Sequence, residues 1–276
     1  MSLARNGNSL HYISEGKGPT VILIHGLGAS HYDWESLRPA LALAGYRALA
    51  VDLPGHGDST KPPDPDFYTV DNFYQVLEKW IVELDAPPPY YLVAHSLGGY
   101  LSLRYAQRHP GNVLALALID PFYSILQTSP ILRYLSRKPD LGIRLLENVP
   151  NAWVERLLGW DPVSKETFSL DARLQIIIDI KRASPHILNI PRSLVDLTPE
   201  LEAIKTPALV IWGKKDLTLR PASFPLLVSE LPDAQGHMVR GSGHQPHIGK
   251  PQLVNQLVLD FIAAHAGGDY KSLCEN

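Results

Sequence analysis

The sequence predicts an α/β fold built on a mostly parallel, doubly wound sheet, and three observations support this prediction. Continuous apolar runs of strand length recur along the first 120 residues and again near residue 210. Segments with helical periodicity separate these runs, an alternation that is typical of a parallel sheet. Between residues 122 and 200 the strand pattern gives way to apolar residues at helical spacing, which predicts a helical insertion.

The individual elements are bounded by glycine, proline and polar turn residues. An edge strand is expected at 10–13, and buried strands are expected at 20–24, 47–51, 91–94, 113–119 and 207–213, with a last small strand at 237–239. Helices are expected at 34–44, 70–84, 97–109, 225–231 and 251–265.

Composition restricts the class of protein. The chain has 276 residues, enough for one elaborated domain, and its scattered charges with a net value of −3 leave no basic face for nucleic acid. The single cysteine, Cys274, rules out an internal disulfide and a cysteine cluster for zinc. No signal-peptide pattern opens the chain, and no apolar run approaches the roughly 20 residues of a membrane span. We therefore expect a cytoplasmic protein without stable membrane insertion.

The most informative stretch is 91–100, which predicts a strand, a sharp turn with Ser96 at its apex, and a helix. Such a turn presses the residues two places either side of the serine together, and Ala94 and Gly98 are both small. The hydroxyl then projects from the sheet edge. The N–H of Leu97 lies at a helix N-terminus, where it can stabilise a developing oxyanion.

This stretch resembles the nucleophile elbow of the α/β-hydrolase family, in the residues Ala94-His95-Ser96-Leu97-Gly98. Alanine at 94 departs from the common glycine, although it is the next smallest residue. Residues 25–28 resemble the family's histidine–glycine loop, which implies that the N–H of Leu27 is the second oxyanion donor beside Leu97. Residues 52–59 resemble a further family turn, and we expect His25 and His56 to support loops rather than to transfer protons.

The resemblance extends to two partners of Ser96. Asp216, just beyond the strand at 207–213, matches the family's acid, and His244, on the loop after the last strand, matches its catalytic histidine. Histidine can accept the serine proton near neutral pH, and the acid orients the imidazole. Asp120 is the competing acid, because it also follows a buried strand, and His247 is the competing histidine.

The resemblance implies that the insertion, which follows the strand at 113–119, is a helical cap placed after the sixth strand of the family's fold, and that it lies over the nucleophile and shapes the substrate pocket. The expected domains are a first core part at 1–121, the cap at 122–200, a second core part at 201–266 and a disordered tail at 267–276. Trp153 and Leu157 are candidates for lining the pocket. The apolar composition of the cap favours a substrate with a hydrophobic or aromatic portion.

These expectations define a serine hydrolase that needs no cofactor or metal and cleaves small or medium carboxylic esters through an acyl-enzyme on Ser96. Serine at this position argues against haloalkane dehalogenases and the related epoxide hydrolases, which place aspartate there. The same residues could serve a carbon–carbon bond hydrolase, a lactonase, an amidase or a perhydrolase, or a protein that only binds its ligand. A monomer and a homodimer are both open.

Overall fold

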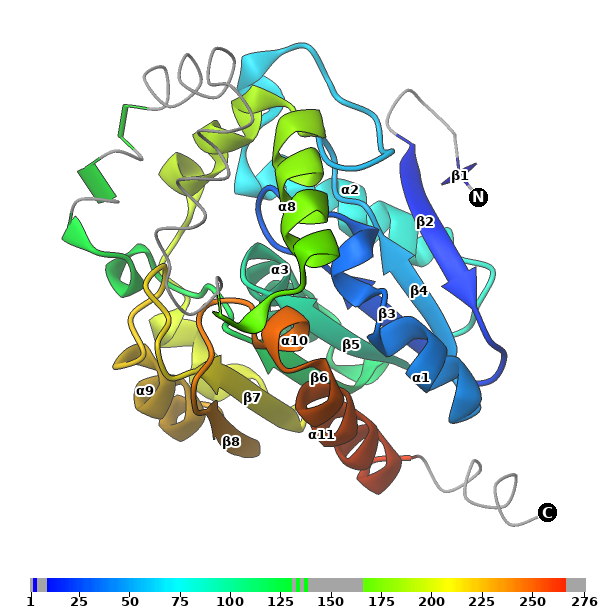
Figure 1. The fold of residues 1–276 in the computed structure, drawn as a ribbon. Helices are drawn as coiled ribbons and strands as arrows, with labels where there is room; N and C mark the ends of the chain where they lie inside the picture. Colours follow the sequence, from blue (N-terminus) through cyan, green and yellow to red (C-terminus); the bar gives the residue numbers. More distant parts are fainter. Residues whose placement is uncertain (1, 4–8, 131–132, 135–136, 139–165, 267–276) are drawn as a thin grey trace.

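The computed structural model describes residues 2–3, 9–130, 133–134, 137–138 and 166–266. Its centre is an eight-stranded sheet with the order β1-β2-β4-β3-β5-β6-β7-β8 (Figure 1). The strands are β1 (Ser2–Leu3), β2 (Leu10–Glu15), β3 (Thr20–Ile24), β4 (Arg47–Val51), β5 (Tyr90–His95), β6 (Val113–Ile119), β7 (Ala208–Gly213) and β8 (Ala234–Val239).

Strands β3 to β8 all run parallel, whereas β1 and β2 form an antiparallel edge. This confirms the predicted fold class, a mostly parallel sheet with helices on both sides. The two-residue strand β1 was not predicted, since it is too short to show a pattern. It pairs with the start of β2, with Leu3 opposite Leu10.

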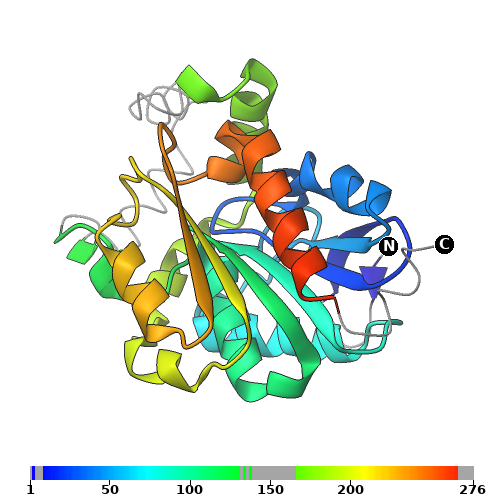
Figure 2. The same cartoon turned by 90° about the horizontal axis from the view of Figure 1, so that it is seen from below.

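The buried strands send alternate side chains into two apolar layers. In β3, Val21 and Leu23 contribute to one layer, while Ile22 and Ile24 contribute to the other. Helices α1 (Leu37–Leu43) and α11 (Pro251–Ala264) cover the first layer. Helices α2 (Val70–Val82), α3 (Leu97–Arg108) and α9 (Ser223–Glu230) cover the second, so the sheet lies between two helical layers (Figure 2). Both faces of the sheet are therefore closed to water.

Some predicted boundaries were wrong by a few residues. The helix expected at 34–44 is a 3₁₀ turn at His31–Trp34 followed by α1. Strand β8 begins at Ala234, three residues earlier than expected, because its first half lies at the sheet edge and carries the exposed residues Gln235 and Gly236 instead of an apolar run.

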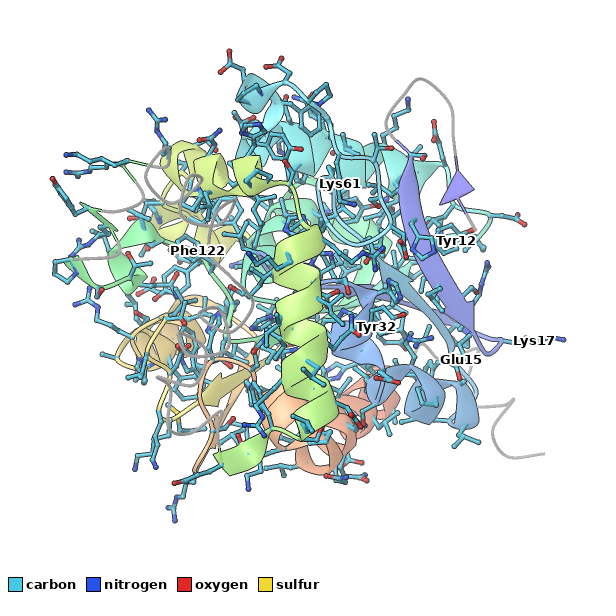
Figure 3. All side chains as sticks on the ribbon, turned by 45° about the horizontal axis from the view of Figure 1, so that its top comes forward. Tyr12, Glu15, Lys17, Tyr32, Lys61 and Phe122 are labelled. Carbon is cyan, nitrogen blue, oxygen red and sulfur yellow. The ribbon has the colours of Figure 1, made fainter. Side chains whose placement is uncertain are left out.

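Between β6 and β7 the described residues contain no strand of the sheet. They form α8 (Leu170–Arg182), the 3₁₀ segments η4 (Ile125–Gln127), η5 (Pro185–Ser193) and η6 (Thr198–Ala203), and their connections. The helical insertion therefore follows the sixth strand, as predicted, and its exact limits stay a prediction. Figures 1 and 3 show α8 in front of the loops that follow β3 and β4. No helix in the described part of the chain is both long and apolar enough to cross a membrane.

Candidate active site

Ser96 lies at the sharp turn between β5 and α3. Its backbone has φ 49° and ψ −113°, a conformation that non-glycine residues rarely adopt. The turn is held by the Ser96 N–H, which donates to the Ile119 carbonyl at 3.1 Å, and by the Ser96 carbonyl, which accepts from Phe122 N–H at 2.9 Å. Strain of this kind persists only where the surroundings enforce it, and it is common at functional sites.

Small residues on both sides make this turn possible. A Cβ atom on Gly98 would collide with the carbonyl oxygens of Ile24 and His25, so β3 can approach the turn only because residue 98 has no side chain. Ala94 is completely buried, and its methyl group fits the apolar layer beneath the turn. The alanine that departs from the family pattern is therefore accommodated by packing.

The structure brings Ser96, His244 and Asp216 together from three separate loops. His244 Nε2 lies 3.1 Å from Ser96 Oγ, and His244 Nδ1 lies 2.8 Å from Asp216 Oδ2. The His244 side chain is 18% exposed, whereas that of Asp216 is completely buried. One imidazole thus connects the hydroxyl of Ser96 to a buried carboxylate.

Asp216 is also bound by its own loop. Its Oδ1 accepts hydrogen bonds from the N–H groups of Thr218 at 2.7 Å and Leu219 at 2.9 Å. Burial alone would raise the pKa of Asp216, but the charge and hydrogen bond of His244 and the hydrogen bond from Leu219 outweigh it and hold the pKa below its ordinary value. Asp216 is therefore ionised at neutral pH and can stabilise an imidazolium.

The two competing residues have other neighbours. Asp120 accepts from the Gly213 N–H at 2.9 Å, and the imidazole of His244 is hydrogen-bonded to Asp216 instead. His247 is buried behind the site, where its ring stacks on Trp34 and its Nε2 lies 3.5 Å from Asp33 Oδ2. The geometry thus favours Asp216 and His244 over Asp120 and His247.

His95, next to Ser96, links this rear region to the loop that carries His244. Its Nε2–H donates to the carbonyl oxygen of His244 at 2.9 Å, and its Nδ1 lies 3.7 Å from Asp33 Oδ2. Burial lowers the pKa of His95 to about 4, so the ring is neutral under ordinary conditions. This hydrogen bond fixes the backbone position of His244, a contact that the sequence pattern did not predict.

The loop after β3 lies against Ser96. A Cβ atom on Gly26 would come within 3.0 Å of Ser96 Cβ, which places the next residue, Leu27, at the same edge of the sheet. Leu97 is the first residue of α3, so its N–H has no acceptor within the helix. Leu27 therefore lies on the loop after β3 and Leu97 opens α3, both next to Ser96, and their role as oxyanion donors stays a prediction.

Two buried histidines hold this loop. His25 Nδ1–H donates to the Gly26 carbonyl at 2.7 Å, and its Nε2 accepts from Leu53 N–H at 2.9 Å. His56 Nε2 accepts from Gly28 N–H at 3.0 Å, and its Nδ1–H donates to the Pro54 carbonyl at 2.8 Å. Burial lowers the pKa of His56 to about 3, so it remains neutral. These contacts agree with the loop-supporting role expected for both residues.

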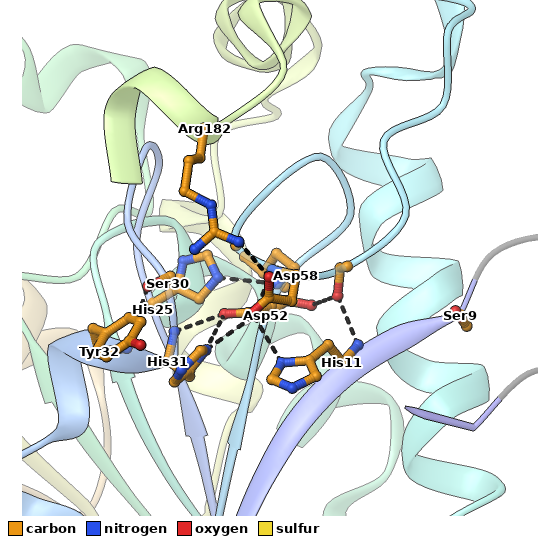
Figure 4. Close-up of polar contacts among 12 residues, drawn as sticks. Ser9, His11, His25, Ser30, His31, Tyr32, Asp52, Asp58 and Arg182 are labelled. Carbon is orange, nitrogen blue, oxygen red and sulfur yellow. Dashed lines mark hydrogen bonds and ion pairs between the residues drawn. The ribbon is translucent and has the colours of Figure 1, made fainter. Parts of the chain in front are cut away.

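Asp52 organises the neighbouring turn (Figure 4). Its carboxylate accepts from the Nδ1–H groups of His11 and His31, each at 3.0 Å, and from the backbone N–H groups of His31 and Asp58. Burial raises the pKa of Asp52, but the hydrogen bond and charge of the histidines outweigh this effect and lower the pKa below its usual range. The sequence did not indicate this cluster, because its members come from β2, the segment after β3 and the turn after β4.

Helix α8 is attached to the same loops. Asp179 Oδ2 accepts from Ser30 Oγ at 2.9 Å, Arg182 pairs with Asp58, and Ser184 N–H donates to the Gly55 carbonyl at 2.7 Å. Phe122, labelled in Figure 3, lies 9% exposed beside Tyr100 at the start of the insertion. The predicted pocket residues Trp153 and Leu157 lie outside the described residues.

Three clusters among the described residues bring at least three histidine or carboxylate ligand atoms within 4.8 Å of one another. They are His11, His31, Asp52 and Asp58; Asp33, His95 and His247; and Asp120, Asp216 and His244. In the first and third clusters, hydrogen bonds between the side chains account for the short distances between histidine and carboxylate. The expectation of no metal and no cofactor stays a prediction.

Comparison with known proteins identifies the family. The model of the α/β-hydrolase fold family matches residues 19–251, and the chain belongs to that family. The order of the site along the chain, serine, acid, then histidine, is the order usual for these proteins.

Individual relatives are distant. The chain is 24% identical to bifunctional epoxide hydrolase 2 of Rattus norvegicus, covering 93% of this chain but only 54% of the rat protein, so it spans about half the length of that relative. It is 26% identical to the pimeloyl-[acyl-carrier protein] methyl ester esterase of Aeromonas hydrophila, over 90% of this chain and 96% of the relative. The structure of a thermophilic esterase from Thermogutta terrifontis superposes with a TM-score of 0.81 at 22% identity, covering 94% and 95% of the two chains. All three relatives are hydrolases.

Proposed function

We propose that this protein is a cofactor-independent serine hydrolase that cleaves carboxylic esters of small to medium, partly apolar compounds through an acyl-enzyme on Ser96. The observation that carries the proposal is the position of His244, hydrogen-bonded at once to Ser96 Oγ and to Asp216. A hydroxyl group is a weak nucleophile until a base accepts its proton, and this arrangement supplies the base and its orienting acid.

The reaction follows from the contacts. Ser96 Oγ attacks the ester carbonyl carbon while His244 Nε2 takes the hydroxyl proton, and the N–H groups of Leu27 and Leu97 stabilise the resulting oxyanion. The bond to the alcohol oxygen then breaks, and His244 returns the proton to the leaving alcohol. A water molecule repeats the sequence on the acyl-enzyme, which releases the acid and restores Ser96.

Ester chemistry is favoured over epoxide chemistry by the nucleophile itself. Attack of the serine hydroxyl on an ester gives an acyl-enzyme, which is itself an ester and can be hydrolysed with the same histidine as base. The epoxide hydrolases that this family includes use aspartate at this position instead. The methyl ester esterase and the thermophilic esterase among the relatives also support esters as substrates. We therefore place the chain with the serine branch of the family.

Turnover of p-nitrophenyl esters from acetate to decanoate tests the proposal. We expect serine-dependent hydrolysis with an optimum at short or medium acyl chains, and a loss of about 10⁵-fold in kcat for Ser96→Ala. Ser102→Ala is the matched control, because Ser102 is a buried serine on α3 outside the triad and its removal should leave the rate unchanged.

Three results would reject the proposal. Equal rates for the Ser96→Ala and Ser102→Ala variants would show that the nucleophile is wrong. Labelling of Ser96 by an organophosphonate without turnover of any ester would favour another substrate class of the same triad, such as a lactone, an amide or a carbon–carbon bond, while absence of both would favour a ligand-binding protein.

A further inference from the structure

Asp120 is a second residue at this edge of the sheet in a strained conformation. It follows β6, is completely buried, and has φ 40°. Among the described residues, Ser96 is the other non-glycine residue with a positive φ. The Asp120 N–H donates to the Ile211 carbonyl at 2.8 Å, so the neighbouring strand β7 holds the backbone in place. A strained backbone at the carboxyl edge of a parallel sheet suggests a functional reason.

The side chain of Asp120 has one satisfied oxygen and one without a donor. Oδ1 accepts from the Gly213 N–H at 2.9 Å, whereas no donor in the described part of the chain reaches Oδ2. The carboxyl group instead contacts that of Asp216. Carboxyl oxygens of both residues and a ring nitrogen of His244 lie within 4.8 Å of one another.

This contact requires a proton. Asp216 Oδ1 already accepts two backbone N–H groups, and Oδ2 accepts from His244 Nδ1. Two ionised carboxylates in a buried contact would repel, and His244 is the single basic group of this cluster. One proton between the two aspartates turns the repulsion into a strong hydrogen bond and fills the remaining acceptor position of Asp216.

We propose that Asp120 keeps its proton at neutral pH and donates it in a hydrogen bond to the Asp216 carboxylate. The acid of the triad is then a pair of aspartates with a single negative charge. Asp120 acts as a positioning residue, because it holds Asp216 toward His244 and does not touch the substrate. In accord with this assignment, burial and the nearby charge of Asp216 raise the pKa of Asp120 well above its usual range, while the pKa of Asp216 is lowered.

The protonation state can be tested without a substrate, so the result is independent of the proposed function. Infrared spectra at pH 8 should contain the C=O stretching band of one protonated carboxyl group, and Asp120→Asn should remove it. Asparagine tolerates a positive φ, and its amide can donate to Asp216 while its oxygen accepts from Gly213, so this variant should fold. Asp179→Asn is the control, since a group with a pKa of about 6 is ionised at pH 8. A spectrum unchanged by Asp120→Asn would overturn the proposal.

The positioning role rests on the proposed ester hydrolysis and has its own test. Asp120→Gly permits the same φ but removes both hydrogen bonds of the carboxyl group, and we expect kcat to fall about tenfold with KM unchanged. Asp120→Asn should restore kcat to within about threefold of the parent. If the glycine and asparagine variants lose activity equally, the hydrogen bond to Asp216 does not position the triad. If the parent hydrolyses no ester, the proposed function fails while the infrared result still stands.

Discussion

Two clusters of aspartate and histidine lie at the carboxyl edge of the same sheet, and they differ in the further groups to which the aspartate and the histidine are hydrogen-bonded. Asp216 Oδ2 lies 2.8 Å from a ring nitrogen of His244, and Asp52 Oδ2 lies 3.0 Å from ring nitrogens of both His11 and His31. The far nitrogen of His244 faces Ser96 Oγ. The carboxylate of Asp52 instead accepts hydrogen bonds from two imidazoles and two backbone N–H groups.

The comparison shows that an aspartate–histidine pair does not by itself make a reactive site. Around Asp52 the hydrogen bonds join β2, the segment after β3 and the turn after β4, so they hold the backbone in place (Figure 4). At Ser96 the same type of pair ends on a hydroxyl held in a strained turn. An aspartate–histidine pair favours catalysis where its third partner is a nucleophile. It favours structural support where its third partner is a backbone group.

The comparison predicts its largest effect at Asp216. Asp216→Asn should lower kcat by about 10³- to 10⁴-fold, because an amide cannot stabilise the imidazolium and favours the wrong tautomer of His244. KM should change little, since Asp216 is completely buried and bound by its own loop. Steady-state kinetics on the preferred p-nitrophenyl ester would measure both constants, and a loss below tenfold would remove Asp216 from the proposed triad.

At Asp52 the expected effect is on folding instead of turnover. Asp52→Asn should reduce the free energy of unfolding at pH 7 by about 3 kcal/mol, since it leaves the buried His31 and the partly buried His11 without an anion. The lowered pKa of Asp52 means that its contribution is present above the ordinary aspartate value near 4 and is lost as the pH falls toward the folded-state value. The difference between parent and variant in urea unfolding should therefore shrink from pH 7 to pH 3.

If the difference in stability between the parent and Asp52→Asn stayed constant from pH 7 to pH 3, the charge of Asp52 would not stabilise the fold. A kcat loss as large as that of Asp216→Asn would erase the distinction between the two clusters.

Substitution of Asp179, on α8 and bonded to Ser30 in the loop after β3, should have a smaller effect on stability, of the opposite sign. Burial raises its pKa to about 6, so the native protein keeps a proton that the unfolded chain releases near pH 4. The stability of the parent therefore falls as the pH rises through this interval, and Asp179→Asn removes the penalty. We expect the variant to gain about 2 kcal/mol relative to the parent between pH 4 and pH 8 in urea unfolding. No gain would indicate that Asp179 is ionised in the native state already at pH 4.

The sequence predicted best those features whose pattern lies within a short stretch of the chain. The order of strands and helices and the turn at Ser96 follow from apolar runs, periodicity and two small residues, all within short windows. The half-exposed strand β8 and the two-residue β1 carry little such signal, and their limits were misjudged or missed.

Contacts between distant segments were harder to anticipate. The Asp52 cluster joins residues from β2, the loop after β3 and the turn after β4, and the Asp120–Asp216 contact joins the ends of two neighbouring strands. The sequence suggested Asp120 only as a rival to Asp216, because spacing along the chain carries no information about a shared proton. The pocket residues Trp153 and Leu157 stay predictions.

The most direct test of the central claim is to identify the residue that reacts. The parent protein, Ser96→Ala and Ser102→Ala should be treated with a fluorophosphonate, followed by intact-mass measurement and peptide mapping. The proposed mechanism predicts one adduct per chain, on Ser96, in the parent and in Ser102→Ala, and none in Ser96→Ala. An adduct on another residue, or equal labelling of the Ser96→Ala variant, would contradict the assignment of Ser96 as the nucleophile.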